Sequence, residues 1–252
     1  MHKLFPLAAL VLLFVSCSKS DPLQTGTISE YYPLKVGKYA IYTLDSTLYV
    51  SFGQVKETHS NIIKDIVDAS ITDNLGRPSY RIRRMLRDKA DTSKWVDHAT
   101  YLVTPTVGSL ELIEDNLRFI KLQLPIRDYL TWNGNRYLPE EAFPQYGFNS
   151  TAHSRLDTWQ YNYENVNSSS IINGKIFDST ITVSSTITDS TGFPPVNING
   201  PAFKTIWQEK YAKGVGLISR AINLEEFQPR SNTYPNGYYS GFAIKQILVE
   251  HN

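Results

Sequence analysis

Cysteine is nearly absent from this chain, and so is any imbalance of charge. Cys17 is the only cysteine among 252 residues, which excludes an intramolecular disulfide, a Cys-x-x-Cys redox site and a cysteine-rich metal site. The 25 basic and 24 acidic residues leave a formal net charge of +1, so nothing draws the chain toward nucleic acid or an acidic membrane face. Nucleic acid is therefore not an expected partner.

Catalytic motifs are missing as well. The chain has no Gly-x-Ser-x-Gly elbow, no His-Glu-x-x-His helix and no phosphate-binding loop. The pairs Glu140-Glu141 and Glu225-Glu226 could supply carboxylates for glycoside hydrolysis, but no feature of the sequence brings either pair near a partner. We therefore expect no catalytic residue, no metal site and no cofactor.

The first residues have the three-part order of a secretory signal. Lys3 supplies a positive start, Leu4–Val15 is an apolar run broken by one proline, and a serine and Cys17 follow at once. This run is shorter than the ~20 apolar residues that span a bilayer as a helix. A cleaved signal peptide over residues 1–16 is therefore favoured over a retained membrane helix.

Phe14-Val15-Ser16-Cys17 resembles the lipobox of bacterial lipoproteins, with a small residue just before the cleavage point and a cysteine just after it. The resemblance implies that Cys17 becomes the mature N-terminus and carries a diacylglyceryl thioether and an N-linked acyl chain such as palmitate. Two or more acyl chains anchor a protein stably, whereas one chain binds only marginally. The expected partner is then the membrane, through Cys17; the alternative is an ordinary signal peptide followed by a chance cysteine.

The chain after the signal divides into a short polar segment and a long remainder. Residues 17–30 have neither a helical nor a strand period, so we expect a flexible tether. Residues 31–252 are expected to form a single β domain, because β sandwiches and barrels of this length are common. In some lipoproteins of the Bacteroidota, acidic residues after the cysteine resemble a surface-export signal. Only Asp21 lies there, beside Lys19, so the periplasmic and surface faces of the outer membrane both stay open.

Composition and periodicity favour an all-β fold. Sixteen tyrosines and many Thr, Ser, Ile and Val favour strands over helices. Apolar and polar residues alternate in stretches such as Tyr39–Leu44 and Tyr80–Met85, and turn signals such as Asn173-Gly174 separate the stretches. Roughly ten or more antiparallel strands predict a closed barrel, a half-barrel or a two-sheet sandwich.

One of these strands carries a basic cluster that could bind phosphate or an acidic sugar. Alternation along a strand divides the cluster between two faces. We therefore expect a solvated outer face paired with Asp and Glu of neighbouring strands. The cluster consists of Arg81, Arg83, Arg84, Arg87 and Lys89.

Four stretches resemble a group of uncharacterised lipoproteins of the Bacteroidota. They are the opening Tyr31–Tyr42 (YYPLKVGKYAIY), the strand Asn116–Ile126, the turn Trp132–Asn135 (WNGN) and the hairpin Glu209–Ile218, which contains YAKGVGLI. Ala40 stands where tryptophan is usual in that group. The resemblance covers most of the chain and implies a fold and a location in the cell envelope, as an outer-membrane lipoprotein, but no activity.

The chain loses its periodicity from Tyr129 to Arg155 and collects aromatic residues there. A loop of this length inside a compact domain is often either functional or disordered, and the aromatic residues argue against disorder. It is either a plug that covers one end of the barrel or sandwich, or a loop that faces a ligand. The candidate ligand-binding residues are Trp132, Asn133, Asn135, Tyr137 and Tyr146.

Three Asp-Ser-Thr triplets resemble the acceptor sequence of periplasmic O-glycosylation in the Bacteroidota. Their candidate acceptor residues are Ser46, Ser179 and Ser190. Such short patterns also arise by chance in Ser/Thr-rich strands.

Two classes of function follow from these features. The first is a lipid-anchored envelope protein that is not an enzyme and binds a ligand or partner, such as a glycan or another envelope protein. The second is a glycan-degrading hydrolase that uses carboxylates such as Glu140 or Glu141. The sequence names neither the ligand nor the substrate.

Overall fold

The computed structural model describes residues 26–90, 94–148 and 155–252. The expected signal peptide, Cys17 and residues 18–25 of the expected tether lie outside these residues. The chain begins with the short helix α1 (Ile28–Tyr31) and continues in twelve strands. The strands are β1 (Tyr39–Val50), β2 (Val55–Thr72), β3 (Pro78–Asp88), β4 (Val96–Pro105), β5 (Ser109–Glu114), β6 (Leu117–Gln123), β7 (Thr131–Asn133), β8 (Gln160–Ile172), β9 (Lys175–Ser185), β10 (Ala202–Ala212), β11 (Gly216–Gln228) and β12 (Tyr238–His251).

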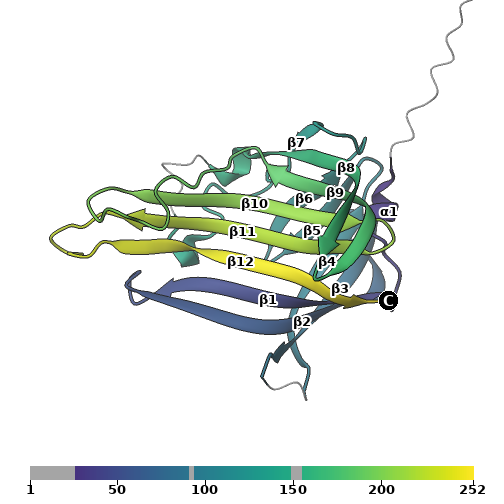
Figure 1. The fold of residues 1–252 in the computed structure, drawn as a ribbon. Coiled ribbons are helices and arrows are strands. Elements are labelled where there is room, and N and C mark those ends of the chain that lie inside the picture. Colours follow the sequence, from purple (N-terminus) through teal and green to yellow (C-terminus); the bar gives the residue numbers. More distant parts are fainter. Residues whose placement is uncertain (1–25, 91–93, 149–154) are drawn as a thin grey trace, which may run out of the picture.

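All twelve strands belong to one antiparallel sheet that curls into a nearly closed barrel (Figure 1). Except for β6 and β7, strands adjacent in the sequence pair with each other; β12 pairs with β1, and β6 and β7 form the two edges. These edges meet where the Ile120 amide donates to the Gly134 carbonyl at 2.7 Å. A Cβ at Gly134 would lie 2.6 Å from the Tyr161 ring, so the closure needs glycine there. The all-β prediction is confirmed, and of the three predicted arrangements the barrel is the one that forms.

The two ends of the barrel carry different connections. We call the end that bears α1 and the C-terminus the N-terminal rim (Figure 1). The opposite end is the distal rim. The N-terminal rim comprises residues 32–38, 73–77, 106–108, 124–130, 173–174 and 213–215, and the distal rim includes residues 51–54, 186–201 and 229–237. Within the described residues, no helix is long and apolar enough to cross a membrane.

The described part of the expected tether is packed against the domain. Gly26 forms a β-bridge with Ile126, and Thr27 caps α1 through a reciprocal hydrogen-bond pair with Glu30. Ile28 is buried, so residues 26–30 are part of the folded domain and not a flexible tether. The cause is burial of apolar surface, which the polar appearance of residues 17–30 concealed.

The alternating stretches Tyr39–Leu44 and Tyr80–Met85 form parts of β1 and β3, as predicted. β8 continues through Asn165 and Asn167, which take positive φ angles and make bulges without ending the pairing. β7 lies within the long aromatic loop and pairs Trp132 with Tyr161. A strand this short is below the length at which alternation can be recognised.

Large side chains fill the barrel interior. Trp207 lies between the rings of Phe119, at 5.7 Å, and Tyr161, at 6.1 Å, as measured between ring centroids. Such contacts contribute beyond the area they bury, and native cores are packed as densely as organic crystals. The interior is therefore a packed core, with little of the open space that ligand-carrying barrels enclose.

Candidate functional site

Three of the five candidate loop residues are engaged within the folded barrel, and one of them, Trp132, bonds across its closure. The Trp132 indole donates through Nε1 to the Ile120 carbonyl at 2.9 Å, and its ring lies 4.7 Å from that of Tyr163. Asn133 Nδ2 donates to the Asp157 carbonyl at 2.9 Å. The third of these residues, Asn135, is buried. The Asn135 Oδ1 accepts from the Tyr161 hydroxyl at 3.2 Å, so all three side chains make contacts within the protein.

The other two candidates lie apart from one another. Tyr137 is about half exposed beside the guanidinium groups of Arg118 and Arg136. Tyr146 ends the 3₁₀ helix η1 (Pro144–Tyr146), and its ring packs 4.6 Å from that of Phe242. The five residues therefore do not converge on one cavity. Their ligand-binding role stays a prediction.

A chain of buried charges crosses the barrel interior. Arg84 makes a two-pronged contact with Asp65, at 2.8 and 2.9 Å, and donates to Glu114 at 2.8 Å. Arg220 continues the chain at 3.6 Å from Glu114 and donates through Nε to Glu209 at 2.8 Å. The sequence analysis placed Arg84 on a solvated face; that was wrong, because Arg84 shares the inward phase of its strand and finds its carboxylates inside.

Glu209 is the centre of this network. Its carboxylate also accepts from Lys121 Nζ at 2.9 Å and from the Tyr211 hydroxyl at 2.6 Å, and the residue is 2% exposed. Burial acts to raise the pKa of Glu209, but Lys121 and Arg220 outweigh it and lower the pKa to about 2. Burial likewise lowers the pKa of Lys121. The network is internally neutralised and acts as a scaffold.

The interior leaves very little room beside these charges. A cavity of about 60 Å³ lies near the N-terminal rim and is lined by Tyr32, Asp65, Arg84 and Arg220 among others. A water molecule takes up about 30 Å³ of liquid, so this space suits about two waters. A second interior cavity, beside Asn135, measures about 10 Å³. Neither accommodates a sugar or a lipid chain, whose pockets measure about 300 Å³ or more.

A larger hollow lies on the outer face of β10, β11, β12 and β1. Its volume is about 370 Å³, within the usual range for small-molecule sites. The strand register explains its shape, because Asp45, Lys245, Ala221 and Gln208 are direct neighbours in one row across the four strands. We call this hollow the outer groove. Its lining includes Asp45, Thr47, Lys204, Gln208, Ser219, Ala221, Asn223, Ala243 and Lys245.

Small side chains form the floor of the outer groove, and long polar side chains form its sides. In the next row, Ala243 pairs with both Thr47 and Asn223, which places a second alanine beside Ala221. Gln208 Nε2 donates to the Ser184 hydroxyl at 3.2 Å, which orients its amide. The groove therefore offers amide, ammonium and carboxylate groups around a shallow floor, with Ile244 and Ile247 as further apolar lining.

Two stacked tyrosines lie next to the outer groove. The rings of Tyr49 and Tyr239 are 5.0 Å apart and 9° from parallel. The Tyr49 hydroxyl donates to buried Glu225 at 2.7 Å, and Asn223 Nδ2 donates to the same carboxylate at 2.6 Å. Gly241 permits this arrangement, since it has φ +92° and a Cβ there would lie 1.8 Å from a β11 carbonyl oxygen. The Glu225 carboxylate thus serves to hold Asn223 and Tyr49 in place.

The carboxylates considered for hydrolysis lie in unrelated surroundings. Glu140 and Glu141 are exposed, and Glu140 lies 4.0 Å from Arg155. Glu225 and Glu226 are adjacent on β11, and both are buried. Across the described residues, no group of three or more His, Cys, Asp or Glu is placed to hold a metal ion.

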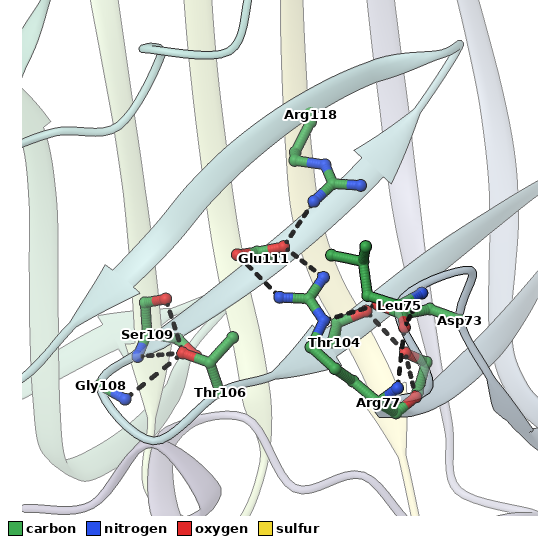
Figure 2. Close-up of polar contacts among 10 residues, drawn as sticks. Asp73, Leu75, Arg77, Thr104, Thr106, Gly108, Ser109, Glu111 and Arg118 are labelled. Atoms are coloured by element: carbon green, nitrogen blue, oxygen red, sulfur yellow. Dashed lines mark hydrogen bonds and ion pairs between the residues drawn. The ribbon is translucent and has the colours of Figure 1, made fainter.

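A second buried carboxylate, that of Glu111, stabilises the fold near the N-terminal rim (Figure 2). Glu111 is 6% exposed and accepts from Arg77, at 2.9 and 3.3 Å, and from Arg118 at 3.0 Å. Arg77 also donates to Asp73 at 2.7 Å, which fixes the turn between β2 and β3. The cluster joins that turn to β5 and β6. With both arginines engaged, it offers little to an anionic ligand.

The three predicted acceptor serines occupy different positions. Ser46 lies within β1 and is half-buried, Ser179 lies within β9 with φ +55°, and Ser190 is exposed in the connection between β9 and β10. The Asp189 carboxylate accepts from the backbone and the hydroxyl of Thr191 in that last triplet. Their modification stays a prediction, and Ser190 is the most accessible of the three.

Sequence analysis did not identify the outer groove. Its members come from four strands, and only the register makes Ala221 and Ala243 diagonal neighbours. The usable signal was weak: small residues recur on the outward phase of β11 and β12, at Ser219, Ala221, Gly241 and Ala243.

No protein-family model matches the chain, and no curated protein matches it. A crystal structure from Bacteroides fragilis, described provisionally as an exported protein with a YmcC-like fold, shares 9% identity and a TM-score of 0.36. It covers 88% of this chain and 98% of its own. A Parabacteroides distasonis structure, described provisionally as a lipoprotein, shares 9% identity and a TM-score of 0.40 over 88% and 97% of the two chains. Likenesses at these TM-scores do not indicate a function for this chain.

Proposed function

We propose that this chain is a lipid-anchored cell-envelope protein whose barrel is a rigid scaffold, and that the outer groove binds a polar, extended ligand of the glycan class. The observation that carries the proposal is the contrast in volume, about 370 Å³ in the groove against about 60 Å³ in the interior cavity. Gln208, Asn223, Lys245 and Asp45 supply the hydrogen-bonding groups that hydroxyl-rich ligands require.

The envelope location is supported by the order of the first residues. Lys3, the apolar run Leu4–Val15 and Cys17 have the arrangement of a lipoprotein signal. The intact mass of the mature protein should correspond to a chain that starts at Cys17 with acyl chains attached. Cys17→Ala should remove the added mass and release the protein from membranes. An unmodified mature chain would refute the anchor. Protease treatment of intact cells, with a periplasmic marker for leakage, then distinguishes the surface from the periplasmic face of the outer membrane.

Glycan binding is tested on an array of bacterial and host glycans. Gln208→Ala and Asn223→Ala should each weaken binding about tenfold, because a hydrogen bond to a neutral group contributes about 1 to 1.5 kcal/mol. Thr100→Ala is the matched control, since Thr100 is an exposed position on β4, remote from the groove lining. Equal weakening by the control, or none by the groove variants, would refute the groove as the site.

The hydrolase alternative is tested on the same ligands. Release of reducing sugar that is abolished by Glu140→Gln or Glu141→Gln would favour an enzyme. The positions of these two residues on the surface give no support to that outcome. Tryptic peptides that span Ser46, Ser179 and Ser190 report on O-glycosylation, and unmodified peptides at all three sites would refute it.

A further inference from the structure

The N-terminal rim carries apolar side chains at the tips of its turns. Val107, between β4 and β5, is fully exposed, and Leu75, between β2 and β3, is 70% exposed. Ile171 and Ile176 face each other across the β8–β9 hairpin and are 71% and 69% exposed. Tyr129 is 85% exposed in the segment that follows β6. Exposed apolar groups gathered at one end of a protein typically mark a surface that meets a partner or a membrane.

The distal rim also carries exposed apolar side chains, so their exposure alone does not show which end of the barrel meets a partner or a membrane. Phe52 in the β1–β2 turn is 85% exposed, and Val196 in the connection after β9 is 96% exposed. The two rims differ in their distance from the start of the folded chain. Gly26 pairs with Ile126, which belongs to the N-terminal rim.

The length of chain between Cys17 and Gly26 determines which rim can reach the bilayer. Eight residues lie between Cys17 and Gly26, which makes nine steps along the chain, and a fully extended chain spans at most about 3.6 Å per step, so the lipid lies within about 32 Å of the N-terminal rim. The 14 residues of β12, at about 3.3 Å each and tilted by about 40°, give the barrel a height of about 35 Å. Even a fully extended tether would therefore fall short of bringing the distal rim to the same bilayer.

A groove at the N-terminal rim adds a second feature. Its volume is about 310 Å³, and Ile28, Leu34, Pro105 and Leu124 contribute apolar walls next to the hydroxyl of Thr106. Thr106 directly precedes the protruding Val107. The rim thus combines projecting apolar tips with an apolar recess that has polar edges, which suits the boundary between lipid headgroups and acyl chains.

Basic side chains lie among these tips. Lys35, Arg127 and Lys175 are exposed on the rim. The Lys213 ammonium lies 3.5 Å from Glu30 and over the Tyr31 ring, at 5.5 Å from its centroid. Cations beside apolar tips favour a surface that carries phosphate groups, where each contributes modestly.

We infer that the N-terminal rim docks on the lipid surface that holds the Cys17 anchor, with Val107, Leu75 and the Ile171–Ile176 pair inserted at the headgroup boundary. The inference rests on the proposed lipid anchor and adds an orientation to it. The short tether keeps the rim at a high effective concentration near the bilayer, so contacts that are weak individually are sufficient. The barrel then stands on the membrane with the distal rim pointing away from it.

The test uses the full-length chain, expressed with its signal and isolated from membranes in its lipidated form. Lipidation blocks Cys17, so a cysteine introduced elsewhere is the only free thiol. Val107→Cys and Leu75→Cys are labelled with an environment-sensitive fluorophore. The matched controls are Phe52→Cys and Val196→Cys, on the distal rim, where these side chains are 85% and 96% exposed. Each protein is placed in vesicles of phosphatidylethanolamine and phosphatidylglycerol.

Aqueous iodide should quench the labels at positions 107 and 75 about threefold less than those at 52 and 196, and brominated lipids should quench only the first two, because groups at the interface lie about 5–10 Å into it. Equal iodide quenching at all four positions in anchored protein would overturn the docking and leave the anchor intact. Shielding that appears only after an envelope protein extract is added would assign the rim to a protein partner and would also overturn it. A free thiol in the unsubstituted chain would overturn the anchor, and the docking with it.

Discussion

Replacing Glu209 by glutamine should be among the most destabilising single changes to this barrel. The substitution keeps the size of the side chain and removes its charge. It leaves Lys121 and the Nε–H of Arg220, both within 2.9 Å of the present carboxylate, without their anion. Arg220 retains a more distant carboxylate at 3.6 Å, that of Glu114. In the variant, the free-energy cost of burying these two cations is therefore no longer offset by the Glu209 carboxylate.

The size of this effect can be worked out in two ways. Removing one partner of a buried ion pair costs about 3–5 kcal/mol. The folded-state pKa of about 2, against 4.5 for the free group, corresponds to about 3 kcal/mol of linked stability. Because the folded pKa is the lower one, this stability is fully present above pH 4.5 and is lost as the pH falls toward 2. The two routes agree on a loss of about 3 kcal/mol at neutral pH.

Urea unfolding at pH 7 and at acidic pH, followed by tryptophan fluorescence, measures this loss. Glu140→Gln is the matched control, because the Glu140 side chain is 69% exposed and lies 4.0 Å from Arg155. It should change the free energy of unfolding by less than about 0.5 kcal/mol. The double variant Glu209→Gln with Lys121→Met should recover part of the loss, since it removes a cation that the single variant strands.

Two results would refute this reasoning. One is a Glu209→Gln protein within about 1 kcal/mol of the unsubstituted chain, which would mean that water reaches the network. The other is an unchanged loss of stability between pH 4.5 and 2 in the variant, which would assign the acid sensitivity to other carboxylates.

Three further predictions follow from single contacts. Gly241→Ala should destabilise the barrel by more than about 4 kcal/mol or prevent folding, because its Cβ would overlap a carbonyl oxygen at 1.8 Å; the melting temperature and soluble yield measure this. Trp132→Phe should cost about 1 kcal/mol in urea unfolding through loss of the bond to Ile120, and it should leave glycan binding unchanged. Arg77→Met should lower the free energy of unfolding by about 2 kcal/mol, because it withdraws two hydrogen bonds from buried Glu111, and a normal urea midpoint would contradict this.

The sequence predicted the strands well because their signals are local. Alternation along Tyr80–Met85 and turn residues such as Asn173-Gly174 act over a few residues, and both appear in the structure as β3 and the β8–β9 turn. Length and composition did not choose between barrel and sandwich. That choice depends on where β6 and β7 meet, through Ile120 and Gly134, and short-range patterns do not encode a contact between two sheet edges.

The interior charges illustrate what the sequence conceals. Arg84 has the same phase as Ile82, so its inward direction follows from alternation alone. An inward arginine is stable only with partners, and these are Asp65 and Glu114, from two other strands. The sequence does not show that Arg84, Asp65 and Glu114 are neighbours, because this depends on the strand register. Without known partners, a solvated position was the natural expectation for Arg84.

The proposed site, the outer groove, differs from the aromatic loop predicted from the sequence, and the reason is related. Aromatic residues such as Trp132 suggest a ligand loop, but the same rings and amides also suit closure of a barrel, and the contacts of Trp132 are of that kind. The outer groove arises from small residues such as Ala221 and Ala243, which attract no notice singly. Grooves of this type depend on neighbours across strands, which only the folded sheet defines.

Filling the outer groove is the most direct test of the proposed function. Ala221→Trp places an indole on the groove floor without changing any charge, and Thr100→Trp places the same ring on an exposed position of β4 as a control. Binding of labelled envelope polysaccharide is measured for both variants and the unsubstituted protein. The account predicts that Ala221→Trp abolishes binding while Thr100→Trp retains it. Undiminished binding by a folded Ala221→Trp protein would contradict the account.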